Sequence, residues 1–155
     1  MRYDAKIKDY PDLVKFISQN FNVVTVCPEV EIGLSVPRPP VQLYGTRNNI
    51  EVRVRDDRSI DITDKINKYC QQQPLELNTI HGYIFKSKSP SCGIKDIPLF
   101  NKQGEATDTT MGVFSNAILQ HYPNLPITDE QGLLKTSQCE HFLHLVKLFQ
   151  ENKSC

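Results

Sequence analysis

Residues 81–93 read His81-Gly82-Tyr83-Ile84-Phe85-Lys86-Ser87-Lys88-Ser89-Pro90-Ser91-Cys92-Gly93, and this stretch decides how the rest of the chain is interpreted. The apolar run from His81 to Phe85 predicts a buried strand, and the small and polar residues after it predict a loop. In that loop Cys92 follows a proline that fixes the backbone and lies near two lysines. Backbone N–H groups, hydroxyls and positive charge can together hold a thiolate, so we predict a reactive loop at a strand end.

A second cysteine has a similar setting. Cys27 follows the β-branched run Val23–Val26, which is typical of a central strand, and it precedes Pro28-Glu29. A helix from Pro11 to about Asn20 is expected before this run. A helix followed by a buried strand predicts an α/β fold, and we expect a single-domain, three-layer sandwich with a mostly parallel, Rossmann-like sheet. Ligands of such sheets bind at the carboxyl ends of strands, where both cysteines are expected to lie.

The apolar spacing places the remaining elements, and no repeat, low-complexity tract or linker divides the chain into more than one domain over residues 1–155. In chain order we expect strands at 41–44 and 50–54, a helix from about Asp64 to Gln72 that Pro74 stops, irregular chain over 96–104, a helix from Thr109 to His121, a short strand at 125–128, and a last helix with a capping box of Ser137 and Glu140.

The composition argues against several classes of protein. Lys+Arg number 18 and Asp+Glu number 18, so the 155-residue chain has no general field that would draw it onto nucleic acid or an anionic membrane. No apolar run is long enough to span a bilayer, and the first residues lack the apolar core of a signal peptide. Five cysteines, an odd number, favour reduced thiols over a disulfide framework, and we expect a cytoplasmic protein.

The residues alone leave the chemistry of the two thiols open. Cys92 could act as a nucleophile, although the sequence positions no histidine to activate it. Cys27 and Cys92 could instead ligate a metal or an iron–sulfur cluster if neighbouring strand ends bring them together. The Cys and His side chains of residues 139–144 match no zinc-ligand spacing, and the helix cap already explains the glutamate among them.

Arg38 lies between prolines in the segment Pro37-Arg38-Pro39-Pro40, which predicts an extended loop that presents the side chain rather than packing it. Its guanidinium is either a solvated charge or a group that binds an anion or a carbonyl oxygen. The position of Arg38 after a candidate active cysteine favours the functional interpretation.

Several motifs occur in the order found in a known family. They are Arg2-Tyr3-Asp4, Cys27-Pro28-Glu29-Val30 with Gly33-Leu34, Pro37-Arg38, Lys86 with Ser89-Pro90-Ser91-Cys92-Gly93, Met111-Gly112-Val113-Phe114, and Pro123-Asn124-Leu125-Pro126. Over nearly its whole length the chain resembles the YbbK-like family of bacterial proteins, which contains thiouracil desulfurase.

The resemblance implies a small α/β domain that removes sulfur from a thiolated heterocycle, such as thiouracil, without a redox change. It implies a [4Fe-4S] cluster held by three cysteines, of which Cys27 and Cys92 are present. An iron without a protein ligand would accept the sulfur as a Lewis acid. The expected partner is therefore a small thiolated base or nucleoside, with no nucleic acid and no membrane.

The same resemblance assigns roles to the residues around these cysteines. Glu29 would take the proton from the attacking water, and Ser89 would be the second catalytic group, which orients the substrate or relays a proton. From their position and charge alone, and not from the resemblance, Arg38 and Lys86 would bind the substrate by stabilising a developing anion, and Ser91 would also contact the substrate.

The beginning of the chain departs from the family pattern. In the family a first cysteine lies in a glycine-containing loop after an N-terminal strand, upstream of the Arg-Tyr-Asp motif, whereas this chain starts at Met1-Arg2. We therefore expect the domain to lack that strand and the third cluster ligand. The alternatives are recruitment of Cys70, Cys139 or Cys155, a degenerate member that binds a heterocycle or nucleoside without turnover, and a cluster-free thiol enzyme that uses Cys92.

Overall fold

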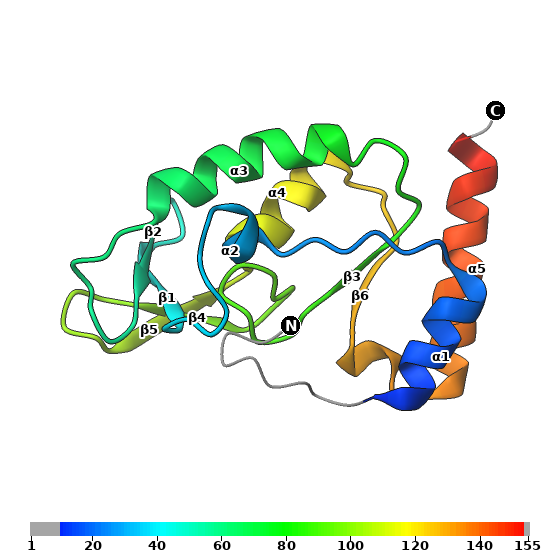
Figure 1. Ribbon diagram of the computed structural model, residues 1–155, viewed down its shortest axis with the longest axis horizontal. Helices are drawn as coiled ribbons and strands as arrows, with labels where there is room; N and C mark the ends of the chain where they lie inside the picture. Colours follow the sequence, from blue (N-terminus) through cyan, green and yellow to red (C-terminus); the bar gives the residue numbers. More distant parts are fainter. Residues whose placement is uncertain (1–9, 154–155) are drawn as a thin grey trace.

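The computed structural model describes residues 10–153, which form two sheets with helices packed around them (Figure 1). The α/β class expected from the sequence is therefore confirmed. The Arg-Tyr-Asp motif, the expected absence of an N-terminal strand and Cys155 all concern the ends of the chain and lie outside the described residues.

The larger sheet has four strands in the order β2-β1-β4-β5. β1 (Val41–Thr46) and β2 (Asn49–Val54) form the expected antiparallel hairpin. β4 (Ile97–Phe100) pairs in parallel with β1 and antiparallel with β5 (Ala106–Thr110). The sheet is mixed, so the expectation of a mostly parallel sheet is wrong. The connections between β1 and β2 and between β4 and β5 are too short for a parallel crossover, which needs a dozen or more residues.

The smaller sheet consists of β3 (Tyr83–Phe85) and β6 (Ile127–Asp129), which run parallel. Both strands overlap the strands predicted at 81–85 and 125–128. Phe85 is paired with Asp129, so the two strands end at the same edge of the sheet. The segments that follow them, the loop 86–93 and the chain from residue 130, therefore leave the sheet side by side.

Helices pack in two groups (Figure 1). α1 (Pro11–Asn20) and α5 (Thr136–Lys153) share a buried cluster with the 3-10 helix η1 (Gln131–Leu133). α3 (Thr63–Glu76) packs against α4 (Val113–His121). None of the helices in the described part of the chain is long and apolar enough to cross a membrane.

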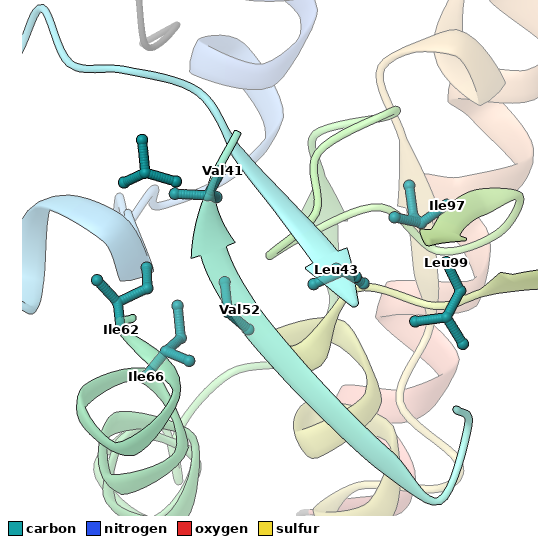
Figure 2. Close-up of a cluster of buried hydrophobic side chains, with 8 residues drawn as sticks. Val41, Leu43, Val52, Ile62, Ile66, Ile97 and Leu99 are labelled. Carbon is teal, nitrogen blue, oxygen red and sulfur yellow. The ribbon is translucent and has the colours of Figure 1, made fainter. Parts of the chain in front are cut away.

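The core of the larger sheet explains why α3 lies where it does. Ile62 and Ile66, at the start of α3, pack with Val52 and Leu43 of the hairpin and with Leu99 of β4 (Figure 2). Ile66, Val52 and Leu43 are fully buried. Removal of these branched side chains from water is the main force that holds α3 against the sheet.

Three predicted elements are wrong. Pro74 was expected to stop α3 but lies within its last turn, where the missing N–H removes a single hydrogen bond. The segment 96–104, expected to be irregular, contains β4. Val23–Val26 is not a strand, and Val23 and Val24 are 56% and 71% exposed. A β-branched run becomes a strand only when its backbone pairs with a neighbour, and no described segment pairs with this one.

Candidate functional site

Cys27 precedes a single helical turn, α2 (Pro28–Glu31), rather than ending a strand. Pro28 at the first helical position suits the start of this turn, and the backbone N–H of Glu31 donates to the Cys27 carbonyl at 2.9 Å. Gly33 then adopts a φ of 94°, a left-handed conformation that favours glycine, where the turn ends. The chain beyond it reverses and brings Arg38 back to Glu29.

The Glu29 carboxylate is buried and accepts one hydrogen bond on each oxygen. Arg38 Nε donates to Glu29 Oε2 at 2.7 Å, and Ser91 Oγ donates to Glu29 Oε1 at 2.8 Å. Arg38 Nη2 also lies 3.9 Å from Cys27 Sγ. The prolines around Arg38 had suggested a side chain presented to solvent, but Arg38 is packed inside the protein. Burial is possible because the buried Glu29 neutralises its charge.

The loop 86–93 is pressed onto the start of α4. The Phe114 backbone N–H donates to the Ser91 carbonyl at 2.8 Å, and the Cys92 backbone N–H donates to Ser89 Oγ at 3.1 Å. At Gly112 an added Cβ would lie 2.6 Å from the Ser91 carbonyl oxygen, so only glycine allows this approach. The Met-Gly-Val-Phe motif therefore shapes the loop that carries Cys92.

Cys27 and Cys92 lie in one region, which we call the thiol compartment and define by Cys27, Cys70, Cys92 and Tyr69. Cys70, Cys92 and Tyr69 pack on the same buried cluster of apolar side chains. Burial, and after it the nearby negative charges of Glu29 and Cys27, raises the pKa of the Cys92 thiol to about 12. The structure thus brings the two predicted ligands together beside the predicted base.

The other thiols differ in position. Burial raises the pKa of Cys70, on α3, to about 12. Cys139 is buried in the separate cluster between α1 and α5, where its Sγ donates to the Leu133 carbonyl. Of the alternative ligands named from the sequence, only Cys70 lies in the thiol compartment, because Cys139 packs elsewhere and Cys155 is outside the described residues.

Sequence reasoning missed Tyr69. In the described part of the chain its hydroxyl is the one buried side-chain N or O atom without a hydrogen-bond partner. The ring packs on Phe114 with centroids 5.5 Å apart. Buried polar atoms are nearly always bonded, so an unbonded one needs an explanation. The helical spacing of α3 gave no signal that this residue packs on the same buried cluster as Cys92.

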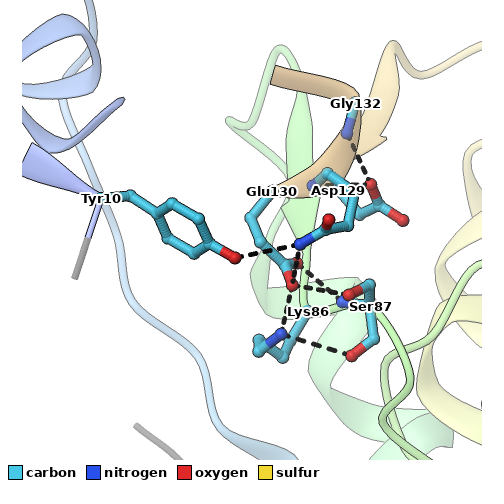
Figure 3. A network of polar contacts seen from close by, with 7 residues as sticks. Tyr10, Lys86, Ser87, Asp129, Glu130 and Gly132 are labelled. Carbon is cyan, nitrogen blue, oxygen red and sulfur yellow. Dashed lines mark hydrogen bonds and ion pairs between the residues drawn. The ribbon is translucent and has the colours of Figure 1, made fainter. Parts of the chain in front are cut away.

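Sequence reasoning also missed a second buried carboxylate, Glu130, at the start of the loop 86–93 (Figure 3). It is ion-paired with Lys86 and accepts hydrogen bonds from the Ser87 backbone N–H at 2.8 Å and from Ser87 Oγ at 2.6 Å. Burial would raise the pKa of Glu130, but the bonds from Lys86 and Ser87 outweigh it and lower the pKa to about 2. Glu130 lies two residues after the strand predicted at 125–128, and nothing in the sequence distinguishes it from an ordinary glutamate.

A cavity of about 560 Å³ adjoins the site. Glu29, Arg38, Lys86 and Ser89 line it together with side chains of β1 and β4. Ser91 is fully buried and is not among its lining residues, so its hydroxyl serves Glu29 instead of facing the cavity. Four of the predicted catalytic and substrate-binding residues therefore share one cavity, and the fifth lies directly behind Glu29.

The comparisons with known proteins agree with this arrangement. The family model for 2-thiouracil desulfurase matches residues 1–130, and the chain belongs to that family. Among solved structures, the fold is similar to that of the [4Fe-4S]-dependent thiouracil desulfidase TudS, with a TM-score of 0.56 and 23% sequence identity. The match covers 84% of this chain and 83% of the other. No curated protein matches the sequence. The family resemblance inferred from the motifs is confirmed.

The residues of the thiol compartment can be tested against the cluster that the family resemblance implies. Cys27 and Cys92 supply two thiols, and the Tyr69 hydroxyl beside them lacks an acceptor that a sulfur-rich group would provide. Within residues 10–153, however, no group of three or more His, Cys, Asp or Glu side chains could hold a metal ion. The described residues therefore offer the cluster two cysteine ligands, and they form no complete binding group by themselves.

Proposed function

We propose that this protein removes sulfur from a small thiolated heterocycle, such as thiouracil, by hydrolysis in the cavity beside Glu29. The observation that carries the proposal is one buried carboxylate, Glu29, that lines a cavity, pairs with the arginine beside Cys27 and lies near Cys92. Hydrolysis of a thiocarbonyl needs a base for the attacking water and an acceptor for the departing sulfur. Glu29 and the cysteine pair meet these two requirements within one site.

Cys27 and Cys92 are the proposed ligands of an iron–sulfur cluster. When bound there, the cluster supplies an iron with an open coordination position that takes up the substrate's sulfur. The contribution of the chain is to hold both half-buried cysteines near the base. Arg38, which is 3.9 Å from Cys27 Sγ, adds a positive charge beside the place where negative charge gathers.

Glu29 is the proposed general base. The buried Arg38 guanidinium pairs with this carboxylate, and each carboxylate oxygen accepts only one hydrogen bond from the described residues. Each oxygen therefore keeps an acceptor position, which can be used by a water molecule in the cavity. In this proposal Glu29 takes the proton as the water oxygen attacks the carbon that carries sulfur.

The remaining residues position these groups. Ser89 Oγ accepts the Cys92 N–H, so its hydroxyl hydrogen can be donated to a substrate in the cavity. Ser91 holds Glu29 in place by donating to Oε1. Lys86 is paired with Glu130 but keeps half of its side chain exposed at the cavity, where it can contact an electron-rich edge of the heterocycle.

A second candidate is a binding protein without turnover. The observation that favours it is that the described residues supply two thiols and no larger metal-binding group. A cluster-free thiol enzyme is disfavoured, because a nucleophilic cysteine must be a thiolate, whereas burial keeps the pKa of Cys92 at about 12.

Anaerobic reconstitution with iron and sulfide separates these candidates. We expect the wild-type protein to become brown, to hold iron and sulfide in equal amounts, and to convert thiouracil to uracil and sulfide. Cys27→Ala and Cys92→Ala should each lose the colour, while Cys139→Ala, in a separate buried cluster, should keep it. A colourless wild-type protein that still binds thiouracil would support the binding protein and refute the desulfurase.

A further inference from the structure

The Tyr69 side chain reaches from α3 into the space between two other elements of the site. α3 packs against α2, whose first turn follows Cys27, and against α4, whose start holds the loop with Cys92. The Tyr69 ring is fixed in this position by Phe114, which is fully buried. Its orientation is therefore set by the core and not by a bond at its hydroxyl.

The hydroxyl itself has no hydrogen-bond partner among the described residues, although water is excluded from it. Such an arrangement costs free energy unless something else accepts the hydrogen bond. Tyr69 and Cys92 pack on the same cluster of buried side chains, and negative charge on Glu31, Cys92 and Cys27 raises the pKa of Tyr69 after the larger effect of burial. An acceptor bound between the two thiols would therefore be within its reach.

We propose that the Tyr69 hydroxyl donates a hydrogen bond to a sulfur atom of the iron–sulfur cluster held by Cys27 and Cys92. This inference rests on the proposed function and adds a residue that tunes the cofactor. Sulfur atoms of such clusters accept hydrogen bonds, and the bonds stabilise the more negative, reduced state. Tyr69 then raises the reduction potential of the cluster, while the folded protein without a cluster gains nothing from the hydroxyl.

The chain offers a matched control for Tyr69. The Tyr122 hydroxyl lies in the same region of the core, but it donates to the Pro74 carbonyl at 2.7 Å. Substitution of either tyrosine by phenylalanine removes the same single atom. Tyr69→Phe removes a hydroxyl without a partner in the cluster-free protein, whereas Tyr122→Phe breaks an existing bond.

The test compares both variants with the wild type, with and without the reconstituted cluster. Without it, we expect Tyr69→Phe to melt at the wild-type temperature or above, and Tyr122→Phe to melt lower. With it, we expect Tyr69→Phe to hold wild-type amounts of iron but to show a more negative reduction potential by redox titration, while Tyr122→Phe keeps the wild-type potential. Resonance Raman spectra should show a shift of Fe–S modes in D₂O that is reduced in Tyr69→Phe.

Three results would overturn the inference. If the wild type assembles a cluster and Tyr69→Phe has the same potential and the same D₂O shift, the donor is wrong while the proposed function stands. If Tyr69→Phe folds but retains no iron, Tyr69 is needed for assembly and is not a tuning donor. If the wild type itself assembles no cluster, the cluster-dependent function and this inference fail together.

Discussion

Glu29 and Glu130 are buried carboxylates that bind opposite ends of the loop 86–93, yet their surroundings differ. Glu130 accepts bonds from Lys86, from both polar groups of Ser87 and from the Gln131 side chain. Glu29 accepts two bonds, lines the cavity and lies near the thiols. Glu130 thus uses its acceptor positions for bonds from other residues of the chain, whereas Glu29 keeps some acceptor positions that the described residues do not use.

This difference shows how burial can serve two purposes in one site. Bonds from Lys86 and Ser87 hold the pKa of Glu130 at about 2, so this group stays ionised and fixes the start of the loop. Glu29 lines the cavity, where its proposed role as a base requires contact with a water molecule. The following predictions test whether Glu29 acts in chemistry and Glu130 in structure.

The largest effect is expected for Glu29→Gln. The amide keeps the shape of the carboxylate but cannot take a proton, so desulfuration of thiouracil should fall by about 10²–10⁴-fold with the cluster retained. Steady-state sulfide release and the iron content measure these two quantities. Glu31→Gln, an exposed change in the same helical turn, should leave turnover unchanged. Equal losses in Glu29→Gln and Glu130→Gln would remove the distinction between the two carboxylates.

Arg38→Met should have the largest effect on stability. It leaves the buried Glu29 carboxylate without its cation, which costs about 3–5 kcal/mol in comparable pairs. Urea unfolding measures the loss, and the added change Glu29→Gln should restore part of it. Arg47→Met, in the exposed pair with Asp108, should leave the midpoint nearly unchanged. No recovery in the double variant would mean that the Arg38–Glu29 pair does not control the stability of this region.

A smaller loss is expected for Ser91→Ala. Its hydroxyl donates to a carboxylate, and hydrogen bonds to charged groups contribute about 1.5–3 kcal/mol. The control is Ser115→Ala, which is equally buried but donates to the neutral carbonyls of Gly93 and Gly112 and should cost about 0.5–1.5 kcal/mol. Urea unfolding of both variants compares them directly. An equal cost would argue that Glu29 is not ionised in the folded protein.

The smallest effect at neutral pH is expected for Glu130→Gln, because Lys86 remains half exposed. The folded pKa of about 2 lies below the ordinary 4.5, so this carboxylate stabilises the protein above pH 4.5 and loses that contribution as the pH falls toward 2. Glu130→Gln should therefore unfold with a weaker pH dependence between these values, as measured by urea midpoints. The exposed change Glu140→Gln should keep the wild-type slope, and a wild-type slope in Glu130→Gln would contradict the assignment.

Much of the fold follows from local patterns. The apolar spacing of α1, the hairpin of β1 and β2, and the helices α3, α4 and α5 were predicted within a few residues, because each forms from neighbours in sequence. β4 and β5 were not predicted. β4 is short and contains Pro98, and β5 is largely exposed, so neither carries the alternation that marks a strand.

The residues of the candidate site likewise divide into those that sequence motifs predicted and those that they did not. The motifs predicted Cys27, Glu29, Arg38 and the loop 86–93 as site residues, and the family match confirms the family to which those motifs pointed. Tyr69 and Glu130 could not be recognised by residue type, since a tyrosine in a helix and a glutamate after a strand are ordinary. The roles of Tyr69 and Glu130 depend on residues from other elements that surround them in the folded protein.

The sequence by itself determined the α/β class and the family, because these depend on local periodicity and on motifs that are contiguous in the chain, and it predicted the residues of the candidate site. Only the tertiary structure decided that the four-stranded sheet is mixed and that residues 23–26 remain unpaired, because strand pairing depends on which neighbours are available. It also decided that Arg38 is buried against Glu29, that Glu130 fixes Lys86 and Ser87, and that the Tyr69 hydroxyl is buried without a partner among the described residues. Burial and hydrogen bonding join residues far apart in sequence, and no local pattern encodes those distances.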